Sequence, residues 1–329
     1  MAKILKIIAS LVMALSVLVI GAAWWGHGQF KNPGPSETEI SVIIERGMGV
    51  DAIARELHRS GVLAGPLVFR IAARVLSAKQ PLRAGEYVFA PGISPEGALA
   101  LLQSGKTAVR RVTLAEGLST TEILALLERT EGLQGKVWPV PDEGTLLPET
   151  YHFSYGDQRL NIVRRMASAM RDLLTDLWRN RAPGLPFASP QEAVVLASIV
   201  EKETALAIER PRVAAVFINR LRQGMRLQSD PTVVYGLTHG AQPLGRGLTR
   251  ADLKTASPYN TYLVGGLPPG PIANPGSASL EAVLRPAITK DLYFVADGNG
   301  GHLFSKTLKQ HNRNVAKWRK LNKASKTTR

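Results

Sequence analysis

A long apolar stretch near the start of the chain restricts its fold more than any other feature. Residues 7–30 contain no Asp, Glu, Lys or Arg, and the run Ile7–Trp25 is almost entirely apolar. A helix of about 20 such residues crosses the hydrocarbon core of a bilayer. Lys3 and Lys6 precede the run, and basic residues favour the cytoplasmic side of a span. We therefore predict a transmembrane anchor with a short flank over residues 1–30, a cytoplasmic N-terminus, and a body outside the cytoplasm.

A cleaved signal peptide is the alternative interpretation of this stretch. Gly21, Ala22 and Ala23 resemble a small-residue cleavage site. The apolar run is longer than the usual core of about 7–15 residues in such signals. Trp24 and Trp25 also resemble an interfacial aromatic belt. These two features favour a retained anchor.

The charge of the chain is its one unusual bulk property. The formal net charge is +15 over 329 residues, with 45% hydrophobic residues and no cysteine. This length accommodates two or three domains, and the absence of cysteine excludes disulfides and thiolate chemistry. Nucleic acid, anionic lipid and an anionic polymer are the partners that such charge suits. Nucleic acid is the weakest of the three for an exported body, and we predict none.

Much of the positive charge lies at the C-terminus. From His302 onward there is no acidic residue. A solvated last helix with a frayed tail is the simplest interpretation. The basic residues are Lys306, Lys309, Arg313, Lys317, Arg319, Lys320, Lys323, Lys326 and Arg329.

A strand–turn–helix pattern recurs in the first half of the chain. One copy begins at Ser41 and turns at Gly47, and a second begins at Arg111 and turns at Gly117. A partial copy lies between them, with a strand at 85–89 and a helix from Pro95. Residues 41–88 thus follow the order strand, helix, helix, strand, which resembles the LysM module, a small domain that binds N-acetylated glycans. A spacer without a ligand is the alternative.

The overall prediction is an α+β protein in four parts. After the anchor at 1–30 come a LysM-like module at 31–143, a larger α+β domain at 144–322 and a basic tail at 323–329. The large domain begins near Gly144, where the strand–turn–helix pattern ends and a long helical pattern follows at Ile162–Arg179.

A carboxyl group at the end of a buried helix is the strongest catalytic signal. Ser189 and Pro190 mark a helix start, and residues 193–200 are apolar on nearly every side. Glu203 shares a helical stripe with Val195 and Ile199, so burial should raise its pKa, as a general acid requires. Glu201 follows Val194 and Ala197 equally well, and periodicity does not choose between the two glutamates.

The segments after this helix are rich in side chains that suit sugars. Pro211–Arg222 is a second predicted helix, and residues 228–232, 257–262 and 270–276 are predicted loops. Amide, hydroxyl and tyrosine groups bind sugar hydroxyl and N-acetyl groups. The candidate binding residues are Gln228, Ser229, Asp230, Thr232, Tyr235, Tyr259, Asn260, Thr261 and Asn274.

Long ordered motifs in this half of the chain resemble the endolytic murein transglycosylase family (MltG, YceG-like). They are Val-Glu-Lys-Glu-Thr at 200–204, Val-Phe-Ile-Asn-Arg-Leu at 216–221, the run from Gly224 to Gly236, Tyr-Asn-Thr-Tyr at 259–262, Gly-Leu-Pro-Pro-Gly-Pro-Ile at 266–272, Tyr-Phe-Val-Ala at 293–296 and Gly-His at 301–302. The resemblance implies that Glu203 is the catalytic acid. It implies cleavage between N-acetylmuramic acid and N-acetylglucosamine with formation of a 1,6-anhydro end, in a single-pass protein of the bacterial inner membrane that limits the length of nascent strands near penicillin-binding synthases.

Other functions are less consistent with the sequence. A lysozyme-type hydrolase needs two carboxylates flanking the bond, and Asp230 is the second candidate, although we assign it a structural or substrate-orienting role. A metal-dependent amidase needs clustered ligands, but the six histidines are scattered, so we predict no metal and no cofactor. A non-catalytic peptidoglycan-binding scaffold protein remains the alternative function.

Overall fold

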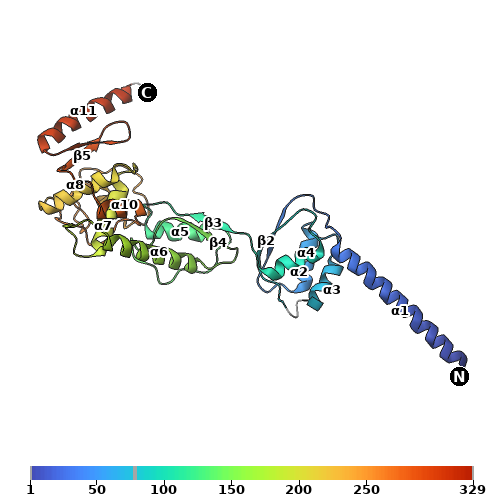
Figure 1. Cartoon of the computed structure of the whole chain (residues 1–329). Helices are drawn as coiled ribbons and strands as arrows, with labels where there is room; N and C mark the ends of the chain where they lie inside the picture. The colour runs from blue at the N-terminus through green and yellow to red at the C-terminus, as the bar shows by residue number, and fades with distance from the viewer. Residues whose placement is uncertain (1, 77–79, 328–329) are drawn as a thin grey trace. The chain divides into compact units, whose positions relative to one another are not determined.

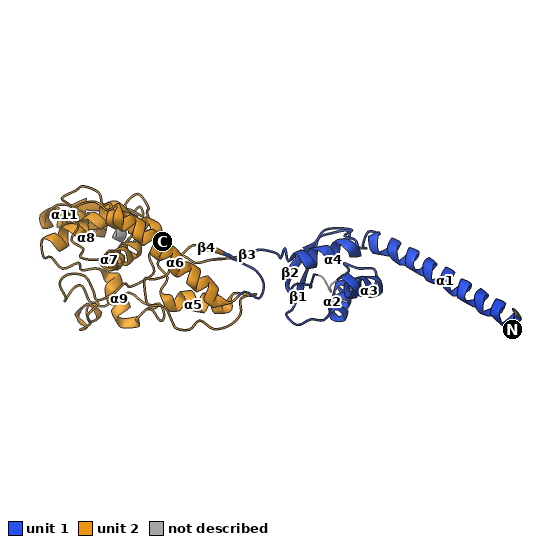
Figure 2. Ribbon diagram, turned by 60° about the horizontal axis from the view of Figure 1, so that its bottom comes forward, with its two compact units in different colours: residues 1–110, 152–157 blue, residues 111–151, 158–329 orange. Residues whose placement is uncertain are grey.

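The computed structural model describes residues 2–76 and 80–327, which form two compact units (Figure 2). Unit 1 contains Met1–Arg110 and His152–Asp157, and unit 2 contains Arg111–Tyr151 and Gln158–Arg329. Residues 111–143, which the sequence pattern grouped with the LysM-like module, belong to unit 2.

The N-terminal apolar run forms one helix, α1 (Ala2–Lys31). Within Lys3–Lys31 an 18-residue window has a mean hydropathy of 2.5, and this segment is long and apolar enough to cross a membrane. At about 1.5 Å per residue such a helix is longer than the hydrocarbon core of a bilayer. The apolar side chains along it are exposed to solvent, which is costly in water unless another apolar phase covers them.

The rest of unit 1 is a small α+β body (Figure 1). Its elements are β1 (Ile40–Ile44), α2 (Val50–Arg59), α3 (Pro66–Leu76), β2 (Gly85–Phe89) and α4 (Pro95–Ser104). The two strands pair antiparallel, with Ile40 opposite Phe89 and Ile44 opposite Gly85. The predicted order of strand, helix, helix, strand over 41–88 is confirmed, whereas glycan binding by this body stays a prediction.

One apolar cluster holds unit 1 together. Alternate residues of β2 face it, so that Tyr87 and Phe89 are buried while Val88 is exposed. Leu57 of α2 and Phe69 of α3 are fully buried in the same cluster. The helices therefore pack on one face of the two-stranded sheet.

Unit 2 is mainly helical. Its elements are β3 (Arg110–Thr113), α5 (Thr120–Arg129), β4 (Thr150–Phe153), α6 (Arg159–Arg179), α7 (Pro190–Glu203), α8 (Arg210–Arg222), α9 (Asp230–Thr238), the short 3-10 helix η1 (Asp252–Lys254), α10 (Ser277–Leu284), β5 (Tyr293–Ala296), β6 (His302–Ser305) and α11 (Leu308–Thr327). β3 pairs with β4, and β5 pairs antiparallel with β6. Both β3 and β4 include residues of unit 1 at one end.

Helix α7 is the centre of unit 2. All eight residues of 193–200 are buried, and the helix contacts α6, α8, α9 and α10. It begins as predicted, with the Ser189 hydroxyl accepting the N–H of Glu192 and proline in the first turn. A helix that is apolar on every side must be enclosed by others, and this enclosure fixes the position of its C-terminal turn.

One predicted loop is instead a helix. Residues 228–232 were predicted to form a turn, but α9 begins at Asp230, with Ser229 at the N-cap. Proline is compatible with the first turn of a helix, where its missing N–H has no partner to lose. The chain reverses just before this start, because Gln228 has a left-handed φ of 51°. The Asp230-Pro231 pair therefore starts a helix.

Candidate functional site

The two glutamates that periodicity left open lie at the end of α7 with different partners. Glu201 is 4% exposed at its side chain and lies 3.0 Å from the Arg210 guanidinium. Its other oxygen accepts the N–H of Gly276 at 2.9 Å. Arg210 also contacts Glu116 at 3.1 Å. Glu201 therefore joins three segments of unit 2 and has no oxygen left for a ligand.

Glu203 has a hydroxyl partner in place of a cation. The Ser229 Oγ donates to Glu203 Oε1 at 2.5 Å, and the Glu203 side chain is partly buried. Burial raises the pKa of Glu203, and the hydrogen bond from Ser229 opposes that shift. The charge of Asp230 raises the pKa further, while His302 and Arg220 lower it. The net rise is what a carboxyl needs in order to act as a proton donor.

A buried hydroxyl network fixes Ser229. Its backbone N–H donates to Thr261 Oγ1 at 3.0 Å, and Thr232 Oγ1 donates to its carbonyl at 2.6 Å. The hydroxyls of Thr232 and Thr261 are 2.8 Å apart, and all three residues are buried. Their burial favours a role in holding the Glu203 partner in place over direct contact with a ligand.

Two predicted asparagines are also buried with their polar groups in use. The Asn260 amide donates to the carbonyls of Leu253 and Thr255. The Asn274 amide donates to Glu143 Oε1 at 2.9 Å, and its oxygen accepts the N–H of Leu146 at 3.0 Å. Both side chains therefore brace loops of unit 2.

The remaining predicted residues are more accessible. Gln228 and Asp230 are exposed. The Tyr262 hydroxyl donates to Asp230 Oδ1 at 2.6 Å. Burial and the Asp230 carboxylate together raise the pKa of Tyr262. Tyr235 and Tyr259 are partly buried, with ring centroids 4.8 Å apart.

Sequence patterns did not indicate two further acidic side chains of this region. Glu143 accepts the N–H of Thr120 at 2.8 Å, and burial raises its pKa. Glu209 Oε2 lies 2.7 Å from Nδ1 of the His302 ring, and Glu209 Oε1 accepts the backbone N–H of His302 at 2.9 Å. Each contact joins segments more than 20 residues apart, so no local spacing could have signalled it.

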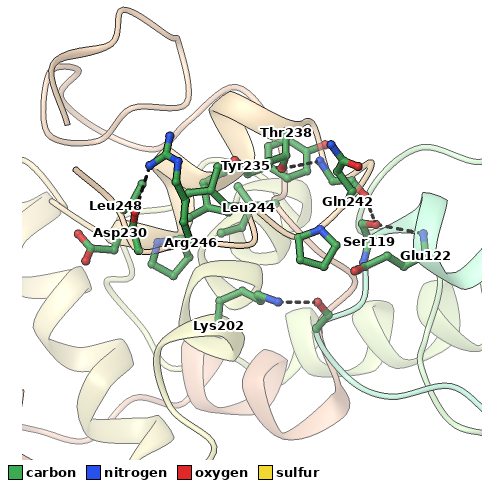
Figure 3. A pocket seen from close by; sticks show the side chains of 17 residues that line it. Ser119, Glu122, Lys202, Asp230, Tyr235, Thr238, Gln242, Leu244, Arg246 and Leu248 are labelled. Carbon is green, nitrogen blue, oxygen red and sulfur yellow. Dashed lines mark hydrogen bonds between the residues drawn. The ribbon is translucent and has the colours of Figure 1, made fainter. Parts of the chain in front are cut away.

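A pocket of about 490 Å³ lies in unit 2 and includes Lys202 and Asp230 in its lining (Figure 3). These two residues are the chain neighbours of Glu203 and Ser229. Ser119 and Glu122 of the second strand–turn–helix copy form part of another wall. Among residues 2–76 and 80–327, no three acidic or histidine side chains gather as metal ligands would.

Comparison with known proteins places this geometry in a family. The profile of the YceG-like family matches residues 42–317. This chain belongs to the YceG-like family. The match begins within β1 and ends within α11, and it includes Glu203, Ser229 and every residue of the pocket.

Curated relatives of this YceG-like chain carry one name. A Bacillus subtilis protein, "Endolytic murein transglycosylase", is 31% identical over 92% of this chain and 91% of its own length. A Streptococcus pneumoniae protein of the same name is 27% identical over 85% of this chain, a match that spans 58% of the relative. The crystal structure of a YceG-like protein from Listeria monocytogenes is 30% identical, with a TM-score of 0.50 over 84% of this chain and 99% of that one.

Proposed function

We propose that this YceG-like chain is a lytic transglycosylase, a lyase that cleaves the glycan strands of peptidoglycan. The names of its relatives support this activity. The observation that carries the proposal within the molecule is the Glu203 carboxyl, partly buried and held by the Ser229 hydroxyl at 2.5 Å. One carboxyl suffices for this reaction, because the nucleophile is a hydroxyl of the substrate itself.

The proposed chemistry uses Glu203 twice. Its carboxyl first gives a proton to the oxygen that joins C1 of N-acetylmuramic acid to N-acetylglucosamine, and the C1–O bond breaks. The 6-hydroxyl of the same muramic sugar then attacks C1 and returns its proton to the Glu203 carboxylate. The products are a 1,6-anhydro end and a free N-acetylglucosamine 4-hydroxyl, and Glu203 regains its starting state.

The hydrogen bond from Ser229 supports this assignment by distinguishing the two carboxyl oxygens. Because Ser229 donates to Oε1, Oε1 acts as the acceptor and the proton to be transferred resides on Oε2. A fixed proton position keeps the carboxyl group oriented towards the oxygen that receives the proton. Asp230 has a substrate-orienting and electrostatic role, since its charge helps Glu203 to keep its proton.

The same proposal includes the cellular setting. We propose that α1 anchors the chain in the inner membrane with a cytoplasmic N-terminus, because its span is apolar and Lys3 and Lys6 precede it. The enzyme then acts outside the cytoplasm on nascent strands and limits their length near the penicillin-binding synthases. The LysM-like body of unit 1 is the proposed glycan-holding part.

Digestion of purified murein sacculi tests the activity. We expect the wild type to release fragments with anhydro ends and Glu203→Gln to release none, as measured by mass spectrometry. Reducing ends in place of anhydro ends would identify a hydrolase. Binding of sacculi without any cleavage by the wild type would favour the scaffold function.

A further inference from the structure

The pocket that Lys202 and Asp230 line is built by four separate segments of unit 2, one of which contributes Ile272. Helix α9 and the loop that follows it form one side, and the start of α5 and the end of α7 form the other (Figure 3). The Ser119 hydroxyl donates to the Gly240 carbonyl at 2.6 Å, and this hydrogen bond joins the start of α5 to the loop after α9. A volume of about 490 Å³ is in the range of pockets that hold small molecules.

The position of the pocket ties it to the reacting bond. Lys202 precedes Glu203 and Asp230 follows Ser229 in the chain, and neighbouring Cα atoms are about 3.8 Å apart. Glu203 does not itself line the pocket, but a substituent on a sugar bound at Glu203 could reach it over this short distance. This argument rests on the proposed function.

The walls of the pocket combine aliphatic side chains with uncharged polar ones, Ser119, Thr238 and Gln242. Pro231, Val234, Leu244, Leu248 and Ile272 line it. Tyr235 is the one aromatic side chain among the lining residues, and its ring packs against Tyr259. The aliphatic side chains favour methyl and methylene groups, and the hydroxyl and amide side chains can bind backbone amide groups. This mixture suits a peptide of small residues, which carries both kinds of group.

Lys202 is the cation in the pocket without a carboxylate partner. Its Nζ donates to the Gly117 carbonyl at 3.1 Å, and no described carboxylate lies within ion-pair distance of it. The other cation, Arg246, is held by both oxygens of Asp252 at 2.6 and 3.0 Å. Lys202 therefore has a charge to offer to a ligand carboxylate.

The two carboxylates that line the pocket already have donors. Glu122 Oε2 accepts the N–H of Ser119 at 2.9 Å in a capping box. Asp230 accepts the Tyr262 hydroxyl at 2.6 Å. They therefore compete less for Lys202, whose ammonium group stays available to an incoming anion.

We propose that this pocket receives the acidic peptide branch carried by the muramic sugar, with the Lys202 ammonium pairing with a peptide carboxylate. The aliphatic wall of α9 and the following loop covers the methyl groups of small peptide residues. The pocket thus makes the enzyme prefer strands that still carry their peptides over strands from which the peptides have been removed.

Two matched substrates test this preference. Glycan strands with peptides are compared with the same strands after removal of the peptides by an amidase, and kcat/KM is measured for each. We expect the wild type to favour the peptide-bearing strands by about tenfold. Lys202→Gln should reduce kcat/KM on those strands by about two- to fivefold, mainly through KM, as loss of an exposed ion pair does.

A second variant separates recognition from any role of Lys202 in folding. Gly247 lines the pocket, its backbone does not require glycine, and an added Cβ would meet no atom within 4 Å. Gly247→Leu should therefore fold normally and lower the preference by occupying the pocket. Lys254→Gln, an exposed lysine outside the pocket, is the matched control and should keep the preference.

The outcomes decide the two proposals separately. Equal kcat/KM for both substrates in the wild type, or an equal loss on both in Lys202→Gln, would overturn the peptide pocket. Failure of the wild type to cleave either substrate would overturn the proposed function instead. In that case the affinities of Glu203→Gln protein for the two strands, with and without Lys202→Gln, still test the pocket.

Discussion

The last turn of α7 has two faces, each with a glutamate, and comparison of them shows how a fold assigns different tasks to identical side chains. On one face Glu201 meets the guanidinium of Arg210 and the N–H of Gly276. On the other face Glu203 accepts a hydrogen bond from the hydroxyl of Ser229, and burial and the negative charge of Asp230 raise its pKa. The neighbours, and not the helix itself, determine that Glu201 braces the structure while the pKa of Glu203 is raised.

The largest expected effect is on the Glu203 face. Glu203→Gln keeps the shape of the side chain and removes the transferable proton, so kcat should fall by about 10²–10⁴-fold. Release of anhydro fragments from sacculi measures it. Glu281→Gln, on the surface of α10 with a side chain 58% exposed, is the matched control and should remain active. Full activity of Glu203→Gln would assign the acid to another residue.

The next effect is on the Glu201 face and concerns stability. Glu201→Ala leaves Arg210 buried with only the more exposed Glu116 as a partner. Breaking a buried pair costs about 3–5 kcal/mol, and the remaining Glu116 contact should reduce the loss to about 2–4 kcal/mol. Urea unfolding measures this free energy. An unchanged unfolding midpoint would show that Glu201 does not brace the fold.

Ser229→Ala sharpens the comparison by removing the partner that is specific to Glu203. Loss of one hydrogen bond costs about 0.5–1.5 kcal/mol, so kcat should fall by about two- to tenfold. The alkaline limb of the kcat/KM profile should move to higher pH, because the hydrogen bond from Ser229 lowers the pKa of Glu203. Ser229→Thr, which keeps the hydroxyl, should restore most of the rate. An alkaline limb that stays in place would contradict the coupling.

Glu203→Gln should also change stability in the opposite direction from Glu201→Ala. The folded state raises the pKa of Glu203 above its ordinary value of 4.5. Folded protein therefore holds a proton that unfolded protein releases, and stability is lost as the pH rises from that ordinary value towards the folded pKa. Glu203→Gln protein has no carboxyl to lose this stability. Its free energy of unfolding at neutral pH should therefore be higher by about 1 kcal/mol, or its Tm by about 2–4 °C. At pH below the ordinary value the gain should vanish.

The smallest effect is expected from Asp230→Asn. The Asp230 charge raises the pKa of Glu203, so its removal should move the alkaline limb of kcat/KM to lower pH, by less than about one unit. Tyr262→Phe removes the hydrogen bond to Asp230 but keeps the charge, and should leave the limb in place. If the alkaline limb moved in both variants, the cause would be the geometry of the loop and not the charge of Asp230.

Local chemistry explains how much of this arrangement the sequence could predict. The start of α7 at Ser189 and Pro190 follows from helix capping, and its burial follows from eight consecutive apolar or small residues. The start of α9 was mistaken for a turn because Asp-Pro serves both purposes. Ser229 at the N-cap makes no side-chain capping hydrogen bond, because its hydroxyl donates to Glu203.

Local spacing predicted the acidic side chains of the site but not their partners. Helical spacing found Glu203 and Glu201 together, but Arg210 and Ser229, which separate their roles, come from other elements. Ser229, Thr232 and Thr261 were predicted among the sugar-binding residues, and their burial instead favours support of the carboxyl. The pocket depends on the contact between Ser119 and Gly240, 121 residues apart, which no spacing rule reports.

The position of the second strand–turn–helix copy determines where a truncated fragment of the protein should begin. Ser119 and Glu122 line the pocket, and residues 111–151 belong to unit 2. A soluble fragment that starts near Gly144 would lose one side of the pocket together with the Glu116 contact to Arg210. A fragment that starts at or before Arg111 keeps both, and is the better choice for crystallisation with muropeptides.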